Sequence, residues 1–333
     1  MTIRFALLGA GRIGQVHAKA ITGTAGASLV AVAEPHLPLA EGIRDRHGAE
    51  IRSLEEIAAA DDIDAVVLCT PTDTHADQIE FFARAGKAIF CEKPVDLSLD
   101  RVRACLEVVR ATGARLMVGF NRRFDPHFQA VRAAIDAGRI GAVEMVSITS
   151  RDPGPPPADY IRASGGIFRD MTIHDFDMAR FLLGEDIETV FATASVLIDP
   201  AIAALGDHDS ASLILTTATG RQCLISNSRR ATYGYDQRIE VHGAAGMIAA
   251  ENQRPVSIEL ANGDGFTRPP LHDFFMTRYT AAYAAEIAAF IAALRAGEDP
   301  KPGGEEGLAA LALAEAALRS VAEKRAVRVD EIL

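Results

Sequence analysis

The chain has 333 residues, of which 49% are apolar and 24% charged, and its formal net charge is -11. This composition excludes a disordered chain, a collagen-like repeat and a disulfide scaffold, and the length predicts two domains. Basic clusters are no longer than Arg122-Arg123 and Arg229-Arg230, which disfavours a nucleic-acid partner because phosphate backbones are bound by clustered Lys and Arg.

The N-terminus and the cysteines both indicate a cytoplasmic protein. The first residues run straight into a strand-like segment without a signal-peptide pattern, and no apolar run is long enough to span a membrane. The four cysteines show no close paired spacing, so we expect reduced core residues and no bound metal. They are Cys69, Cys91, Cys105 and Cys223.

A glycine-rich turn follows the first predicted strand, Ile3–Leu8. It has the GxGxxG pattern between a buried strand and a predicted helix, the context that indicates a dinucleotide site. The first glycine permits the turn, the second lets the backbone approach a pyrophosphate, and the third allows close helix packing. The expected cofactor-binding residues here are Gly9, Gly11, Arg12, Ile13 and Gly14.

The next strand, Leu29–Ala33, ends in Glu34, twenty residues after Gly14. An acidic side chain at this place can accept hydrogen bonds from both ribose hydroxyls and would repel a 2′-phosphate, so it favours NAD over NADP. The alternative is a chance glycine turn with a solvated Glu. His36 or a later Arg could still assist a phosphate.

Helices and strands then alternate up to Gly119, which predicts a doubly wound parallel sheet over residues 1–120. The expected strands are Ala65–Cys69, Ala88–Cys91 and Leu116–Gly119, and the expected helices are Pro38–Arg46, Leu54–Ala60, His75–Ala85 and Leu99–Thr112. Ligands bind beyond the carboxyl ends of such strands. Two strand ends therefore carry further candidates for cofactor binding, Thr70, Pro71, Thr72 and His75 at one end and Glu92 and Lys93 at the other.

Lys93 follows a buried strand and precedes Pro94. One interpretation is that Lys93 is a surface lysine after a strand. In the functional interpretation its ammonium group binds a substrate hydroxyl and helps to set the pKa of the catalytic base.

Residues 121–333 have a different pattern, of strands separated by turns with long helices at the end. This predicts an α+β domain with a large, mainly antiparallel open sheet. The expected strands are Val143–Thr149, Thr189–Ile198, Ala211–Thr216, Gln222–Asn227, Arg238–His242, Met247–Ala250 and Ser257–Leu260, and the late helices Tyr283–Arg295 and Glu305–Glu323 could pack back on the first domain. The Pro-rich loop 153–157 is either a lid or scaffolding against a neighbouring subunit.

The segment Gly165–Leu183 has apolar residues at helical spacing, with Asp170 and His174 four residues apart on one predicted face. An imidazole one turn from a carboxylate has the chemistry of an oriented general base. The plain alternative is a surface pair of little energetic weight.

Taken together, the glycine turn, Glu92-Lys93-Pro94 and the Asp170/His174 segment resemble the glucose-fructose oxidoreductase, inositol dehydrogenase and MocA family over nearly the whole chain. Gly-Phe-Asn-Arg-Arg-Phe-Asp (119–125), residues 165–177 and Tyr-Gly-Tyr-Asp (233–236) look most like its inositol 2-dehydrogenases. The resemblance implies that Lys93, Asp170 and His174 form the catalytic set. It also implies that residues 121–333 serve substrate binding and oligomerisation, with a substrate face formed by the open sheet and homotetramers built through that sheet. The implied substrate-binding residues are Lys93, Arg123, Asp170, His174, Tyr233 and Tyr235, with the choice between the two tyrosines left open.

The function expected from this resemblance is NAD-dependent oxidation of a cyclic polyol in inositol catabolism, myo-inositol to its 2-keto form, with His174 as the general base. Within the same family, scyllo-inositol, another inositol isomer or an aldose such as glucose is the alternative substrate. Two other classes are a non-enzymatic NAD-binding sensor and a metal-dependent lyase using Asp170, His174, Asp175 and Asp177. The intact catalytic set argues against the sensor, and the different helical faces of His174 and Asp175 argue against the lyase.

Overall fold

The computed structural model describes residues 2–333 and divides into two compact units. The first unit contains the residues up to Phe124 together with Thr280–Leu311, and the second contains Asp125–Tyr279 and Ala312–Leu333. Residues 280–311 thus belong to the first unit, a placement that the sequence left open for the C-terminal helices.

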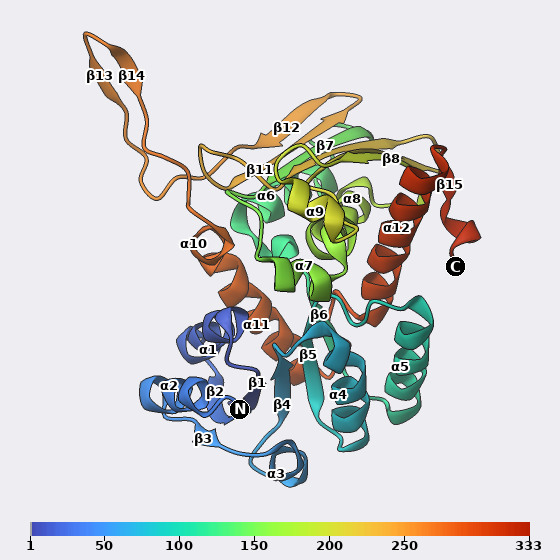
Figure 1. Ribbon diagram of the computed structural model, residues 1–333. Coiled ribbons are helices and arrows are strands. Elements are labelled where there is room, and N and C mark those ends of the chain that lie inside the picture. The colour runs from blue at the N-terminus through green and yellow to red at the C-terminus, as the bar shows by residue number, and fades with distance from the viewer. Residues whose placement is uncertain (1) are drawn as a thin grey trace. The chain divides into compact units, whose positions relative to one another are not determined.

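The first unit is a parallel six-stranded sheet with strand order β3-β2-β1-β4-β5-β6 (Figure 1). This is the order of a dinucleotide-binding fold, in which the connections reverse between β1 and β4. The short apolar runs expected for such a sheet are buried on both faces, and β1 and β6 have the predicted bounds. The strands are β1 (Ile3–Leu8), β2 (Ala27–Ala33), β3 (Glu50–Ile51), β4 (Ala65–Leu68), β5 (Ala88–Glu92) and β6 (Leu116–Gly119).

Six α-helices flank this sheet. They are α1 (Arg12–Gly23), α2 (Leu37–His47), α3 (Leu54–Ala59), α4 (Thr72–Arg84), α5 (Leu99–Thr112) and α11 (Thr280–Ala296), and a 3-10 turn spans Asn121–Phe124. The helix α11 packs on α1 and contributes Phe290 to the core, where its ring lies 6.2 Å from Phe5 and 5.9 Å from Phe90 between ring centroids.

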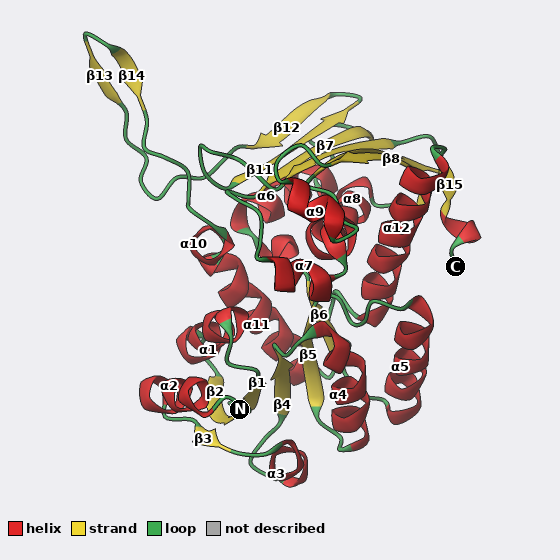
Figure 2. Cartoon of the chain, viewed as in Figure 1, coloured by secondary structure: helices red, strands yellow, loops and turns green. Residues whose placement is uncertain are grey.

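The second unit is built on a seven-stranded sheet (Figure 2). Its strand order is β12-β11-β7-β10-β9-β8-β15. Only the pair β7 and β10 is parallel, which confirms the mainly antiparallel sheet. The strands are β7 (Val143–Arg151), β8 (Ile187–Ser195), β9 (Ser210–Thr217), β10 (Gln222–Ser228), β11 (Asp236–Gly243), β12 (Gly246–Ala250) and β15 (Val327–Arg328).

Helices of the second unit include α6 and α8, which pack against strands of this sheet. The helices are α6 (Pro126–Asp136), α7 (Ala158–Ser164), α8 (Ile173–Leu183), α9 (Pro200–Ala204), α10 (Phe275–Arg278) and α12 (Gly304–Glu323), with α12 beginning in the first unit and ending in the second. A π-helical turn covers Phe168–Thr172 and a 3-10 turn covers Val329–Glu331.

Two expected elements are wrong in detail. The strand predicted at Ser257–Leu260 is instead a short hairpin of β13 (Leu260–Asn262) and β14 (Gly265–Thr267), which forms a sheet of its own and projects away from the seven-stranded sheet (Figure 1). The helix predicted from Gly165 is regular only from Ile173, because a π-helical turn precedes α8.

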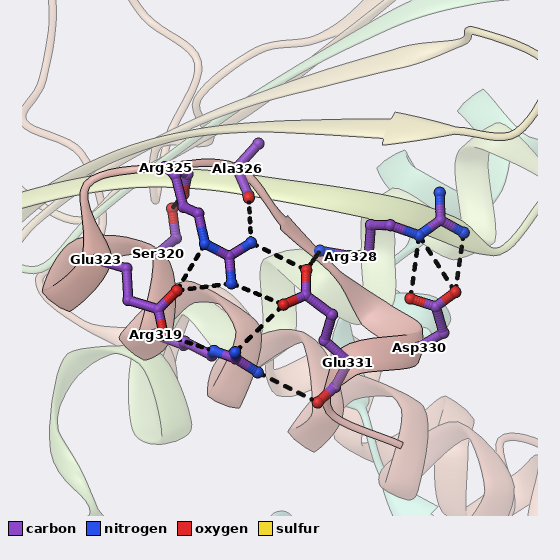
Figure 3. Close-up of polar contacts among 8 residues, drawn as sticks. All are labelled: Arg319, Ser320, Glu323, Arg325, Ala326, Arg328, Asp330 and Glu331. Atoms are coloured by element: carbon purple, nitrogen blue, oxygen red, sulfur yellow. Dashed lines mark hydrogen bonds and ion pairs between the residues drawn. The ribbon is translucent and has the colours of Figure 1, made fainter.

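The C-terminal segment closes one edge of the second unit's sheet. There β15 pairs with β8, and a network of charged side chains holds the turn between α12 and β15 (Figure 3). Arg325 contacts Glu323 at 2.6 Å and Glu331 at 2.7 Å, and Arg319 Nε donates to Glu323 at 2.8 Å. Covering an exposed strand edge in this way prevents pairing with other chains.

Two expectations about composition can be compared with the structure. All four cysteines are free and buried, and burial raises the pKa of each thiol, as expected for inert core residues. Among residues 2–333, no helix combines the length and apolarity required to cross a membrane.

Candidate active site

The glycine-rich turn joins β1 to α1 at the carboxyl edge of the parallel sheet. Gly9 has a φ of 86°, and a Cβ there would lie 2.6 Å from the carbonyl oxygen of Cys69. A Cβ on Gly14 would lie 2.1 Å from the carbonyl oxygen of Gly9, so this position requires glycine for helix packing. Gly11 is exposed, and its Cβ would meet no atom within 4 Å. The backbone at Gly11 is therefore open to a ligand, as a pyrophosphate at a helix N-terminus requires.

Glu34 follows β2 and turns back toward this glycine-rich turn. One carboxylate oxygen accepts the backbone N–H of Ala10 at 2.7 Å, and the other accepts that of His36 at 2.9 Å. A carboxylate oxygen can accept more than one hydrogen bond. Glu34 is thus fixed beside the turn with capacity for ribose hydroxyls, and the site fits NAD.

The two other predicted strand ends are tied together by His75. This buried side chain places Nδ1 2.8 Å from the carbonyl oxygen of Pro94 and Nε2 2.8 Å from that of Thr70. Burial lowers the pKa of His75, partly offset by these two carbonyl groups. Both ring nitrogens of His75 therefore face the protein, and its predicted role in cofactor binding stays a prediction.

The remaining predicted residues lie at or near the carboxyl ends of β4 and β5 or close to the glycine-rich turn. Thr70 donates its hydroxyl to Gln78 at 2.7 Å, Pro71 is exposed, and Thr72 begins α4. Lys93 is half-buried directly after β5, and its backbone N–H donates to the Glu92 carboxylate at 3.3 Å. Arg12 is exposed, Ile13 and Arg123 are half-buried, and all three belong to the first unit.

The second unit carries Asp170 in the π-helical turn and His174 in the first turn of α8. Both side chains are half-buried. The prediction that they share a face relied on α-helical spacing, which begins only at Ile173. Lys93 belongs to the other unit, so the catalytic set as a whole stays a prediction.

Two residues that the sequence did not single out hold Asp170. Tyr160 of α7 donates its hydroxyl to one carboxylate oxygen at 2.9 Å, and Arg229 Nη1 lies 3.5 Å from the other. Arg229 is 1% exposed, and its Nη2 lies 3.7 Å from Asp207, which accepts the backbone N–H of Ile167 at 2.8 Å. The buried guanidinium thus has carboxylate partners on two sides, as a buried charge requires. No signal in the sequence indicated this role, since Arg229 stood out there only as part of a short basic pair.

Asp175 has a structural role. Its two oxygens accept hydrogen bonds from Ser150 at 2.6 Å and Asn227 at 2.7 Å, and the side chain is fully buried. These bonds connect α8 to β7 and β10, which counts against the lyase interpretation because Asp175 is committed to protein donors.

The tyrosines of the motif differ in environment. Tyr233 is 49% exposed, donates to Asp236 at 2.6 Å and accepts from Arg151 at 3.1 Å. Tyr235 is 6% exposed, and its ring packs edge-on against Phe274 and Tyr279. Tyr233 is accordingly the more accessible candidate for a substrate.

One group among the described residues brings potential metal ligands together, at a place that the sequence did not predict. His17, Glu92 and Glu286 are buried and place one ligand atom each within 4.8 Å of one another. All three belong to the first unit.

Comparisons with known proteins agree with this architecture. Residues 3–120 match the family model described as "Oxidoreductase family, NAD-binding Rossmann fold", and residues 128–249 match that of the GFO/IDH/MocA C-terminal domain. Inositol 2-dehydrogenase of Rhizobium meliloti is 71% identical, with 99% of this chain and 100% of the relative covered.

Two solved structures are similar across the chain. The myo-inositol dehydrogenase of Corynebacterium glutamicum superposes with a TM-score of 0.95 at 44% identity, covering 98% of this chain and 99% of the other. The scyllo-inositol dehydrogenase of Lactobacillus casei, solved with bound NAD(H) and scyllo-inositol, gives 0.92 at 27% identity, covering 99% and 100%.

Proposed function

The chain belongs to the GFO/IDH/MocA oxidoreductase family, and we propose that it is an NAD-dependent inositol 2-dehydrogenase that converts myo-inositol to its 2-keto form. The 71% identity with an inositol 2-dehydrogenase across the full length carries this proposal. The turn from Gly9 to Gly14 and the fixed carboxylate of Glu34 provide the matching NAD site.

The proposed catalytic roles follow from the chemistry of three side chains. His174 removes the hydroxyl proton as the general base, and Lys93 donates a hydrogen bond to the reacting oxygen. Asp170, held by Tyr160 and Arg229, orients the imidazole and accepts a hydrogen bond from a neighbouring hydroxyl. NAD, when bound, supplies the acceptor for the hydride that leaves the same carbon.

The remaining proposed contacts concern recognition. Arg123 and Tyr233 bind substrate hydroxyls, with Tyr235 supporting that region from the core. Arg12, Ile13, Thr70, Pro71, Thr72 and Glu92 line the cofactor's path. These assignments rest on the motif match, and alanine scanning with separate KM values for NAD and inositol tests them.

A second substrate has direct support. The Lactobacillus casei relative binds scyllo-inositol and NAD(H) with the same fold, and the two inositols differ only in the orientation of one hydroxyl. NADH formation should therefore be measured with myo-inositol, scyllo-inositol and glucose, using NAD and NADP in parallel. Preferential NAD reduction with myo-inositol supports the proposal. Failure of every inositol isomer, with NAD binding confirmed, refutes it.

We also infer a homotetramer formed through the open face of the seven-stranded sheet. Phe191, Ile214 and Leu224 occupy neighbouring positions on β8, β9 and β10 and are 37–42% exposed. A contiguous apolar surface on a sheet indicates a protein interface. Ile214→Glu should reduce the sedimentation mass, and a monomeric wild type would contradict the inference.

The proposed setting is inositol catabolism in the cytoplasm, where NAD and a polyol are both available. Growth on inositol after deletion of the gene, together with cell fractionation, tests both parts. Normal growth would remove the catabolic role.

A further inference from the structure

A buried cluster of ionisable side chains lies behind Lys93 in the first unit. His17 comes from α1, Glu92 from the end of β5 and Glu286 from α11, and their exposed fractions are 0%, 8% and 0%. Charged side chains are rarely buried without a partner, because desolvation is costly. None of the three has an assigned catalytic role, so the cluster requires an explanation.

The contacts form a chain that ends at the backbone of Lys93. His17 Nε2 lies 2.6 Å from Glu92 Oε1, and Glu92 Oε2 accepts the Lys93 N–H at 3.3 Å. Since the carboxylate oxygen accepts, Nε2 must carry the hydrogen. The His17 ring is packed against Phe90 and Tyr283 with centroids 5.1 and 5.4 Å away, so it has little freedom to turn.

Glu286 approaches the same nitrogen without bonding to it. Its Oε1 lies 4.0 Å from His17 Nε2, and neither carboxyl oxygen has a hydrogen-bond partner among the described residues. Burial, and next the charge of Glu92, raise the pKa of Glu286 well above its ordinary range. At 4.0 Å, Glu286 leaves the His17 N–H to Glu92, which lies 2.6 Å away.

The geometry does not suit a shared metal ion. Two ligands on a tetrahedral zinc, each about 2.0–2.1 Å from the metal, are roughly 3.3 Å apart. The 2.6 Å separation between His17 and Glu92 is instead that of a strong hydrogen bond.

We propose that His17 and Glu286 are positioning residues for Lys93, which fix the Glu92 carboxylate that holds the Lys93 backbone. This inference rests on the catalytic role proposed for Lys93. This series of contacts also joins α1, which follows the dinucleotide turn, to the end of β5, which precedes Lys93. The two segments that are proposed to contact the cofactor are therefore connected through the same buried side chains.

The test uses the small number of lysines in the full-length protein. Reductive methylation with 13C labels its five lysines, Lys19, Lys87, Lys93, Lys301 and Lys324, and Lys93→Arg assigns the Lys93 signal. His17→Leu removes the hydrogen-bond donor, His17→Gln retains an N–H close to Nε2, and Ile291→Ala makes a cavity at another buried position of α11.

We expect His17→Leu to shift the Lys93 signal and to lower kcat roughly 10- to 100-fold, the usual effect of a small misplacement of a catalytic group. His17→Gln should restore both, whereas Ile291→Ala should lower Tm without moving the Lys93 signal. If His17→Leu and Ile291→Ala act alike at equal loss of Tm, His17 has only a structural role and the inference fails. If the Lys93 signal moves only in His17→Leu and the wild-type protein oxidises no inositol, the positioning role of His17 is supported and the proposed reaction is refuted.

Glu286→Gln provides an independent arm if His17→Leu does not fold. A carboxyl with a raised folded-state pKa contributes less stability as pH rises above its unfolded pKa. The Tm of Glu286→Gln minus the Tm of wild type should therefore increase from pH 5 to pH 9, because the glutamine does not titrate. Among the neighbouring titratable groups, Cys69, Tyr283, Glu92 and His17 are the same in both proteins. A constant difference, or a metal that copurifies with wild type and is lost in Glu286→Gln, overturns the inference.

Discussion

Replacing Gly11 with alanine should separate the binding role of the dinucleotide turn from its folding role. Gly11 has φ −65° and ψ −167°, which alanine can adopt, and its Cβ would meet no atom within 4 Å. Stability should hold or rise by about 0.4–1 kcal/mol, since alanine restricts the unfolded chain. The new methyl group would occupy the side on which a pyrophosphate approaches, and overpacking typically costs about 1–3 kcal/mol. NAD affinity should fall about 5- to 150-fold.

Two other glycines of α1 serve as controls. A Cβ on Gly14 would lie 2.1 Å from a backbone oxygen, so Gly14→Ala should lower both Tm and affinity. Gly23 ends α1 with no atom within 4 Å of its Cβ, and Gly23→Ala should leave affinity unchanged. NADH fluorescence measures binding directly, because the chain contains no tryptophan, and calorimetry measures Tm. Wild-type affinity in Gly11→Ala would refute the placement of the pyrophosphate.

Four further outcomes are expected. His174→Ala should lower kcat roughly 10²- to 10⁴-fold with NADH binding retained, and undiminished turnover would remove it as the base. Tyr160→Phe deletes the 2.9 Å hydrogen bond to Asp170 and should lower kcat roughly 2- to 10-fold, because one hydrogen bond is worth about 0.5–1.5 kcal/mol. An unchanged kcat and pH–rate profile would show that Asp170 does not need this hydrogen bond. Glu34→Gln removes a charge that repels a 2′-phosphate. The kcat/KM with NAD divided by the kcat/KM with NADP should therefore fall about tenfold. An unaltered ratio would show that other residues determine the cofactor preference. The hydrogen bond from Arg325, with other contacts, lowers the pKa of Glu331 to about 2. Its contribution to stability is therefore present above the unfolded pKa of 4.5 and is lost as pH falls toward 2. The protection of β15 amides against hydrogen exchange, relative to their intrinsic rates, should fall over that range, and constant protection would contradict this.

Much of the first unit could be predicted because its signals are local. Short apolar runs bounded by turns identify strands buried on both faces, and α5 has the predicted bounds of Leu99–Thr112, with Ser98 as N-cap and Gly113 after its last turn. The sequence neighbours of Gly9, Gly11 and Gly14 were enough to indicate the nucleotide turn.

The second unit and the site depend more on contacts between distant residues. The π-helical turn before α8 is anchored by Thr172, whose hydroxyl donates to Asn227 at 2.7 Å, and no periodicity reveals such a bond. Arg229 reaches Asp170 across 59 residues and His17 reaches Glu92 across 75. Composition and spacing cannot identify partners of this kind.

The return of Thr280–Leu311 to the first unit has a consequence for synthesis on the ribosome. Phe5 and Phe90 are buried against Phe290, so their core is incomplete when Phe124 leaves the exit tunnel. At ordinary translation rates the missing helix follows on the order of ten seconds later. During that interval the nascent parallel sheet exposes apolar surface. The second unit also stays incomplete, because it includes Ala312–Leu333, which are synthesised last.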